Sequence, residues 1–271
     1  MRRRARALSM ALSLAWLPGC VRSPIYYPTT TPAAVVERLA ELHDARVEPI
    51  ASRAIRLVGL RHPAVPDAAE LLFFGGNAMS LVETSGVLAQ LVQDRPWGWA
   101  VWAYRGYDGS QGTPKQDDLI ADAGRQVRHL GARPQRLFLI GQSLGTGVAV
   151  YLAAALSRAG TPPAGVVLLS PYTSIRRVAD EALGMPLGWL LADRWEALPQ
   201  LVDVEAPVLI VHGAGDEVID VAHGRAVAAA LGERARLVVV ADAGHNDLWL
   251  AAETAASIRS FVAEHAAPPP R

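Results

Sequence analysis

The stretch that decides the fold is Arg136-Leu137-Phe138-Leu139-Ile140-Gly141-Gln142-Ser143-Leu144-Gly145. It begins as an apolar run, and residues 146–159 continue it with apolar positions at helical spacing. A strand that passes this abruptly into a helix needs Gly141 and Gly145, because side chains at both positions would collide across the turn. We therefore expect Ser143 to stand out of a sheet, in a strained conformation, at the amino end of a helix.

The rest of the chain alternates short apolar runs with helical periodicities, which is typical of a mostly parallel α/β sheet with helices on both faces. The expected strands cover residues 71–75, 98–104, 136–141, 165–170, 207–213 and 235–240. The expected helices cover residues 116–130, 145–159, 221–231 and 247–264, and residues 55–60 are an expected antiparallel edge strand. With 271 residues and no internal repeat, the chain favours one catalytic-size domain over residues 50–265.

The composition excludes two broad classes of protein. Hydrophobic residues make up 51% of the chain and charged residues 19%, so the chain is not disordered. Lys and Arg number 26, as do Asp and Glu, and the formal net charge is +0. A nucleic-acid partner is not expected, because such binding draws on a basic excess.

The first twenty residues have the pattern of a targeting segment. A basic stretch at residues 2–6 precedes an apolar run at 7–17, which is too short to span a bilayer and ends in Leu17-Pro18-Gly19-Cys20. This pattern resembles a bacterial lipoprotein signal peptide, although Pro18 replaces the usual small residue. The resemblance implies cleavage after residue 19, a lipid on Cys20 and anchoring to an inner or outer membrane of the cell envelope. The alternative is an ordinary secretory signal with an incidental cysteine.

Two flanking regions complete the expected organisation. Residues 20–49 are predicted to be a tether and lead-in, and residues 266–271 a tail. Residues 171–206 are longer than an ordinary crossover and rich in apolar side chains. They are interpreted either as a small cap over a ligand crevice or as a crossover helix without contact to substrate.

The serine hydroxyl needs a base, and the best candidate is His245. It lies in a loop between the expected strand 235–240 and the last helix, at the edge of the sheet where Ser143 also points. The remaining histidines have no comparable context. Asp216, the first carboxylate after the strand 207–213, is the expected acid that orients the imidazole. Glu217 and Asp220 are the alternatives, because the loop is acidic.

Negative charge that develops on a substrate carbonyl needs donors as well. One is expected to be the backbone N–H of Leu144, directly after the serine, and the other the N–H of Asn77. Asn77 ends the turn Gly75-Gly76-Asn77 that follows the first strand. The alternative is a plain strand-to-helix turn.

These motifs together resemble the α/β-hydrolase superfamily, in particular its monoacylglycerol-lipase-like and depalmitoylase-like serine hydrolases, over residues 50–265. The segments that carry the resemblance are Phe74-Gly75-Gly76-Asn77-Ala78, Tyr104-Arg105-Gly106-Tyr107 with Ser110, Gly112 and Pro114, the turn 141–145, Ser170-Pro171-Tyr172-Thr173-Ser174, Val211-His212-Gly213 with Asp216-Glu217, and Gly244-His245-Asn246-Asp247. The resemblance implies nucleophile, acid and base roles for Ser143, Asp216 and His245, with Leu144 and Asn77 as oxyanion donors.

Three positions depart from the family's pattern. Gly75 replaces a histidine that would brace the oxyanion loop, Ala103 replaces an aspartate, and Asp108 replaces a glycine. Arg105 is interpreted as structural, tying loops together through Asp117, Asp118 or Asp122, with direct substrate contact as the alternative.

The sequence thus predicts a membrane-tethered serine hydrolase that cleaves a carboxylic ester or thioester of a small-molecule or acylated substrate through an acyl-enzyme. No cofactor is required and no metal-ligand spacing is present in the sequence. Two alternatives stay open. One is a peptidase of the same fold that acts on prolyl or aminoacyl amides, and the other is a non-catalytic envelope lipoprotein that binds a partner.

Overall fold

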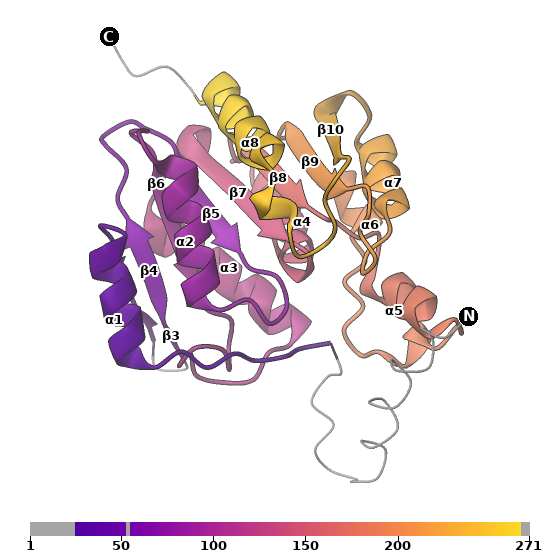
Figure 1. Ribbon diagram of the computed structural model, residues 1–271, viewed down its shortest axis with the longest axis horizontal. Helices are drawn as coiled ribbons and strands as arrows, with labels where there is room; N and C mark the ends of the chain where they lie inside the picture. Colours follow the sequence, from indigo (N-terminus) through magenta and orange to yellow (C-terminus); the bar gives the residue numbers. More distant parts are fainter. Residues whose placement is uncertain (1–24, 53–54, 267–271) are drawn as a thin grey trace, which may run out of the picture.

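An eight-stranded sheet forms the centre of the computed structural model, which describes residues 25–52 and 55–266 (Figure 1). The strand order is β1-β4-β6-β5-β7-β8-β9-β10. These strands are β1 (Arg46–Val47), β4 (Gly59–His62), β5 (Glu70–Phe74), β6 (Gly98–Trp102), β7 (Leu137–Gln142), β8 (Gly165–Leu169), β9 (Val208–Gly213) and β10 (Ala235–Val240). From β6 to β10 neighbouring strands are parallel, whereas β1 and β4 pair antiparallel. The expected α/β fold is confirmed.

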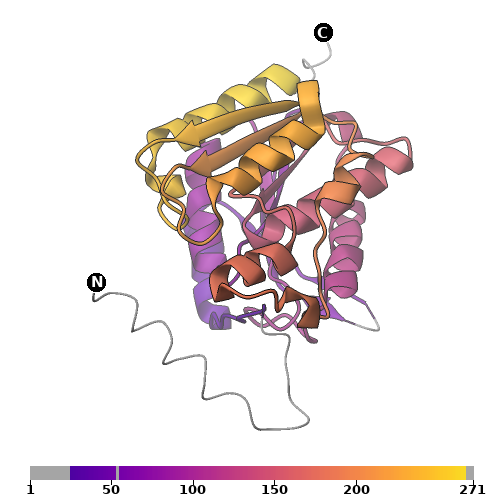
Figure 2. The same cartoon turned by 90° about the vertical axis from the view of Figure 1, so that its right-hand side faces the viewer.

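Helices cover both faces of this sheet (Figures 1 and 2). One face carries α1 (Ala33–Leu42), α2 (Leu81–Val92) and α8 (Ala252–His265), and the other α3 (Gln116–Leu130), α4 (Leu144–Arg158) and α7 (Val221–Leu231). Every residue of β6, β7, β8 and β9 is buried. Double coverage explains why these strands read as continuous apolar runs and not as alternating ones.

The positions of the six expected strands are confirmed to within one or two residues, and α3 and α7 have the expected bounds. The antiparallel edge strand expected over residues 55–60 is confirmed as antiparallel but not as one edge strand. It divides into β3 (Arg56–Leu57), which pairs with β2 (Ile50–Ala51), and β4. Between them the Val58 N–H donates to Ser110 Oγ over 2.9 Å, and this contact takes the amide out of the ladder.

The last helix begins later than expected, at Ala252 and not at Asp247. The Asp247 carboxylate accepts from the Gly244 N–H over 2.6 Å, and this contact closes a loop in front of the short 3-10 turn Leu248–Leu250. Such a local side-chain contact competes with helix formation. The apolar periodicity of residues 247–264 does not indicate this contact, so it could not predict the later start of the helix.

The amino-terminal boundary also differs from expectation. Residues 26–32, expected as part of a tether, lie on the folded domain, and Tyr26 is buried with 6% of its surface exposed. The following residues form α1, which contacts β1. The predicted leader and Cys20 lie outside the described residues. Over the part of the chain that is described, none of the helices combines the length and apolarity that spanning a bilayer requires.

Residues 171–206 leave the sheet and return to it. They contain α5 (Ile175–Leu183), a 3-10 turn at Gly188–Leu190 and α6 (Leu198–Leu201). No residue of α5 is buried, and α5 lies beyond the end of the sheet in Figures 1 and 2. Its exposed apolar side chains include Leu183 and, nearby, Met185 and Trp189. The segment is therefore an excursion and not a crossover helix packed along the sheet.

Candidate active site

The turn between β7 and α4 holds Ser143 in a strained conformation, with φ 49° and ψ −117°. A Cβ on Gly141 would lie 2.4 Å from the Gly145 carbonyl oxygen, and one on Gly145 would lie 2.0 Å from the Phe74 carbonyl oxygen. The Ser143 N–H donates to the Leu169 carbonyl over 2.9 Å, so the neighbouring strand also fixes the turn. The expected requirement for two glycines is confirmed, and the strain places the hydroxyl at the carboxyl end of the sheet.

His245 lies in the loop after β10, at the same end of the sheet. Its Nε2 is 3.0 Å from Ser143 Oγ, and its Nδ1 is 2.8 Å from Asp216 Oδ2. An ionised Asp216 accepts a hydrogen bond from Nδ1–H, which leaves the Nε2 lone pair to accept the Ser143 hydroxyl proton. The structure thus brings the three predicted residues together in one chain of contacts, although 102 positions separate Ser143 from His245.

Asp216 is buried and held on both of its oxygens. Oδ1 accepts from the N–H groups of Val218 and Ile219 over 3.0 and 2.8 Å. Burial raises the pKa of the Asp216 carboxyl, but the contacts with His212 and His245 outweigh this and hold that pKa well below its ordinary range. The carboxylate is therefore ionised at neutral pH.

The two alternative acids have other positions. Asp220 is the N-cap of α7, and its carboxylate accepts from the Ala222 N–H over 2.7 Å. Glu217 is exposed. Of the three carboxylates in this loop, the structure directs Asp216 toward His245.

His212 is a neighbour of Asp216. Sequence reasoning set this histidine aside because it lies at the end of a strand. It is fully buried, and its Nε2 lies 2.9 Å from the Ile219 carbonyl and 3.4 Å from Asp216 Oδ2. The imidazoles of His212 and His245 therefore both lie near the same carboxylate oxygen, Asp216 Oδ2. The place of His212 four residues before Asp216, at the end of a buried strand, was the signal available in the sequence.

The loop after β5 lies beside the serine. A Cβ on Gly76 would lie 3.5 Å from the Ser143 Cβ. The Gly75 carbonyl accepts from the Tyr104 hydroxyl over 2.8 Å, and the Gly76 N–H points to Met79 Sδ at 3.2 Å. The loop predicted to supply an oxyanion donor at Asn77 is thus adjacent to Ser143, and Leu144 is the first residue of α4.

Arg105 has the structural role that was expected. Its Nε and Nη2 donate to the two oxygens of Asp122 over 2.5 and 3.0 Å, and Nη1 lies 3.1 Å from Asp118. The hydrogen bond with Asp122 raises the pKa of the guanidinium above its ordinary value. The two-pronged contact ties the loop after β6 to α3.

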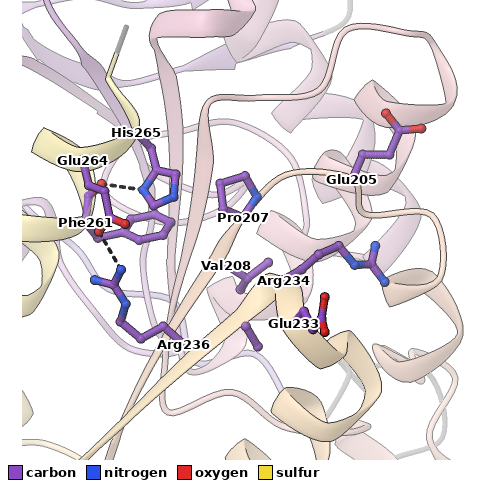
Figure 3. Close-up of a pocket in the computed structure, with 10 residues that line it drawn as sticks. Glu205, Pro207, Val208, Glu233, Arg234, Arg236, Phe261, Glu264 and His265 are labelled. Carbon is purple, nitrogen blue, oxygen red and sulfur yellow. Dashed lines mark hydrogen bonds and ion pairs between the residues drawn. The ribbon is translucent and has the colours of Figure 1, made fainter.

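A second feature, a pocket of about 520 Å³, lies at the amino ends of β9 and β10 (Figure 3). Charged residues rim it and Phe261 forms part of its wall; Arg236 pairs with Glu264 at 2.5 Å. None of the three residues of the Ser143 site lines this pocket. Within residues 25–52 and 55–266, no group of three or more His, Cys, Asp and Glu residues has an arrangement that could hold a metal ion.

Known proteins resemble the chain in sequence and in fold, although no protein-family model matches it. An uncharacterized protein of Mycobacterium tuberculosis is 38% identical over 149 residues, which are 53% of this chain and 51% of that protein. Alpha/beta hydrolase domain-containing protein 17B of Homo sapiens is 33% identical over 198 residues, 72% of this chain and 66% of that protein. The chain therefore spans only about half to two thirds of the length of these relatives.

The solved structures add a likeness of fold. An alpha-beta hydrolase from Vibrio vulnificus superposes with a TM-score of 0.70 at 20% identity. The superposition covers 84% of this chain and 85% of the Vibrio chain. It therefore extends over most of both chains.

Proposed function

Because the chain has the alpha/beta hydrolase fold and is 33% identical over 198 residues to an alpha/beta hydrolase domain-containing protein, we propose that it belongs to the alpha/beta hydrolase superfamily and is a serine hydrolase acting on a carboxylic ester or thioester through an acyl-enzyme. The single observation that carries this proposal is the chain of contacts from Ser143 Oγ through His245 to Asp216. Three side chains from distant parts of the sequence make it, at 3.0 and 2.8 Å. A nucleophile, its base and an orienting carboxylate within hydrogen-bond reach are the parts that acyl transfer requires.

In the first step Ser143 Oγ forms a bond to the substrate carbonyl carbon, and its proton passes to His245 Nε2. The resulting imidazolium carries a positive charge, which the buried and ionised Asp216 stabilises through Nδ1–H. The low pKa of Asp216 serves this step, because a carboxyl that stayed protonated would not stabilise the cation.

The carbonyl oxygen becomes negatively charged in the same step. The backbone N–H groups of Leu144 and Asn77 are the proposed donors to it. Leu144 lies at the amino end of α4, where the helix leaves its first amides without internal partners. Removal of one such donor costs about 2.7–4 kcal/mol of barrier in enzymes of this type.

The second half of the reaction regenerates the serine. The bond from the carbonyl carbon to the leaving oxygen or sulfur breaks, and His245 Nε2 gives its proton to the departing alcohol or thiol. The acyl group then rests on Ser143. Water attacks this ester with His245 as the base, the carboxylic acid leaves, and the proton returns to Ser143.

An acylated substrate suits the surroundings of this site. The excursion 171–206 carries Met185, Trp189 and Leu190 with more than half of each side chain exposed. Exposed apolar side chains on a segment that leaves the carboxyl end of the sheet, the end that also carries Ser143, favour a substrate with an aliphatic acyl chain over a highly polar one.

The test is hydrolysis of p-nitrophenyl acyl esters of rising chain length and of aminoacyl anilides, by the wild-type chain and by Ser143→Ala. We expect turnover of the esters and at least a 10⁴-fold loss in the variant, since removal of the nucleophile leaves only the residual stabilisation of the site. Ser170→Ala is the matched control, because Ser170 also has a positive φ at a strand end but is buried, and its Oγ has no hydrogen-bond partner among the described residues.

Three results would contradict the proposal. Turnover of the anilides alone would indicate a peptidase. Full ester turnover by Ser143→Ala would remove the nucleophile from the mechanism. Wild-type protein that neither turns over the panel nor reacts with a fluorophosphonate probe would indicate a binding protein without catalytic activity.

We also propose that Cys20 carries a lipid that anchors the chain to a membrane of the bacterial envelope. The sequence Leu17-Pro18-Gly19-Cys20 after a short apolar run supports this proposal, and two or more acyl chains anchor a protein stably. Intact mass of protein from the membrane fraction is expected to match a chain that begins at an acylated Cys20. Equal distribution of wild type and Cys20→Ser between membrane and aqueous fractions would contradict it.

A further inference from the structure

The segment before α1, residues 25–31, is here called the strap. It crosses the lower edge of the molecule in Figure 1, on the way to α1. Hydrogen bonds attach it to three elements that are far from it in sequence: the loop after β5, the loop after β6 and the excursion 171–206. All three lie at the carboxyl end of the sheet, as Ser143 does.

The first attachment is to the side chain of Asn77. Its Nδ2 donates to the Ile25 carbonyl over 2.8 Å, and its Oδ1 accepts from the Tyr27 N–H over 2.9 Å. The same oxygen accepts from the Tyr107 hydroxyl over 2.9 Å. The Asn77 side chain is therefore engaged with the strap, while the backbone of the neighbouring Gly76 faces Ser143.

The second attachment runs through Asp108. Thr31 Oγ1 donates to Asp108 Oδ1 over 2.8 Å, and the Asp108 N–H donates to the Thr29 carbonyl over 2.9 Å. Asp108 Oδ2 accepts from the N–H of Leu81, the first residue of α2, over 2.7 Å. This buried carboxylate thus connects the strap to the far end of the loop that begins at Gly75.

The third attachment is a buried contact with the excursion. The Trp195 indole N–H donates to the Tyr26 hydroxyl over 3.1 Å, and both side chains are buried. Burial, with the Asp193 carboxylate nearby, raises the pKa of Tyr26 far above its ordinary value, so the phenol stays neutral. The strap is therefore held at both of its ends and in its middle.

The loop between these points needs support. Gly75 has no side chain to brace it, and Ala78 adopts a φ of 59°, which is strained for a residue other than glycine. Asp108 itself has a φ of 42°, which is also strained for a residue other than glycine. The carboxylate contacts to Thr31 and Leu81 give a physical reason for an aspartate at this costly position, since glycine would make neither.

We propose that the strap braces the oxyanion loop, and that the side chains of Asn77 and Asp108 are positioning residues that set where the Asn77 backbone N–H points. This inference rests on the proposed function, because it assigns the amide of Asn77 a role in stabilising the oxyanion. Neither side chain touches the substrate. A shift of the loop by a fraction of an ångström weakens a hydrogen bond that must be short in the transition state.

The test compares Asn77→Ala and Thr31→Val with Thr30→Val in the full chain. Each substitution leaves the backbone amides in place. Thr30 is exposed and adjoins Thr31, so it is the matched control. Rates with p-nitrophenyl acetate are normalised to active sites titrated with a fluorophosphonate probe, so loss of folded protein does not imitate loss of positioning.

We expect kcat of Asn77→Ala to fall by about 10-fold to 100-fold, less than the 100-fold to 1,000-fold typical for outright loss of a donor. KM should change by less than about threefold, because the interaction strengthens only in the transition state. Thr31→Val should lose less, about threefold to tenfold, because the attachments of the strap to Asn77, to Trp195 and to the Asp108 N–H remain in place. Thr30→Val should match the wild type.

A second readout separates positioning from general stability. An aryl trifluoromethyl ketone forms an adduct with the serine in which an oxyanion occupies the site, so its inhibition constant should rise by the same factor as kcat falls. If Asn77→Ala does not fold, Asn77→Asp, which keeps Oδ1 and loses the donor to the Ile25 carbonyl, serves in its place with Thr31→Val.

The outcomes distinguish the two proposals. If Asn77→Ala and Thr31→Val both keep the wild-type kcat and inhibitor affinity while Ser143→Ala loses activity, the proposal that the strap positions the oxyanion loop is overturned. The proposal of a serine hydrolase is then unaffected. Activity retained by Ser143→Ala would overturn the proposed function itself. If Asn77→Ala and Thr31→Val lower the concentration of titrated active sites but leave kcat per site unchanged, the strap stabilises the fold and does not position the oxyanion loop.

Discussion

The two ends of the sheet differ in a way that volume alone does not reveal. The amino ends of β9 and β10 line a pocket of about 520 Å³, whose charged pair Arg236 and Glu264 is about half exposed. At the carboxyl ends of the same strands, Asp216 is fully buried and His245 nearly so, and each contacts its neighbour at hydrogen-bond distance. The proposed active site is therefore marked by buried groups with fixed partners, and not by open space.

The largest difference between the two ends of the sheet should be a difference in kcat, and a single substitution of Asp216 should reveal it. Asp216→Asn is expected to lower kcat about 10⁴-fold, because an amide holds the imidazole in the wrong tautomer and cannot stabilise its cation. Glu217→Gln, in the same loop but exposed, should stay within about twofold. Steady-state hydrolysis of a p-nitrophenyl ester measures both. Equal losses in the two variants would mean that the loop's net charge, and not Asp216, supports the site.

The turn that presents Ser143 should be the next most sensitive region, this time in stability. Gly145→Ala places a Cβ 2.0 Å from the Phe74 carbonyl oxygen, and backbone cannot give way as a flexible side chain does. We expect about 3 kcal/mol or more of lost unfolding free energy. Gly86→Ala in α2 meets no atom within 4 Å and should instead gain up to about 1 kcal/mol. Urea unfolding curves of the two variants are predicted to move in opposite directions.

The pH dependence of stability offers a smaller contrast. The pKa of Asp216 is depressed in the folded state, so the folded chain binds fewer protons than the unfolded chain and stability rises with pH. This contribution is fully present above the ordinary aspartate pKa of about 3.9 and is lost as pH falls toward the folded value. The gap in Tm between wild type and Asp216→Asn should therefore be constant above pH 5 and narrow toward pH 3. A difference in Tm between wild type and Asp216→Asn that grows as pH falls would contradict the predicted direction of the pH dependence.

The smallest effects are expected at the amino end. Arg236→Ala and Glu264→Gln break an ion pair between side chains about half exposed to solvent, where pairing contributes little and salt screens it. The kcat of each variant should stay within about twofold of wild type, and thermal melts should shift only slightly. A tenfold loss of activity in either would make the pocket of Figure 3 part of the functional machinery and cancel the contrast.

The carboxyl end was also the more predictable one, because its geometry follows from short rules. The clash between Gly141 and Gly145 is local, and parallel strands deliver their carboxyl ends to one edge. Ser143, Asp216 and His245 could therefore be placed together from sequence alone. The sheet followed for the same reason, since buried parallel strands are continuous apolar runs.

The features that sequence reasoning missed depend on single contacts between side chains. Such contacts produce neither a hydrophobic periodicity nor a recognisable motif in the sequence. The strap carries no hydrophobic repeat, and its partner Trp195 lies 169 positions away from Tyr26. Asp108 stood out only as a departure from a family pattern, and its reason became visible with Thr31 and Leu81 beside it. The late start of α8 has a similar cause, a single carboxylate contact that outweighs helical periodicity.

The contact between Tyr26 and Trp195 has a consequence for the folding of the chain during its synthesis. At about 5–20 residues per second, a ribosome adds the 169 intervening positions in roughly 8 to 34 seconds. Through that interval Tyr26 lacks its partner Trp195, and the imidazole of His245 is made later still. Ser143 therefore lacks the imidazole of His245 until the ribosome has added the 102 positions that separate them.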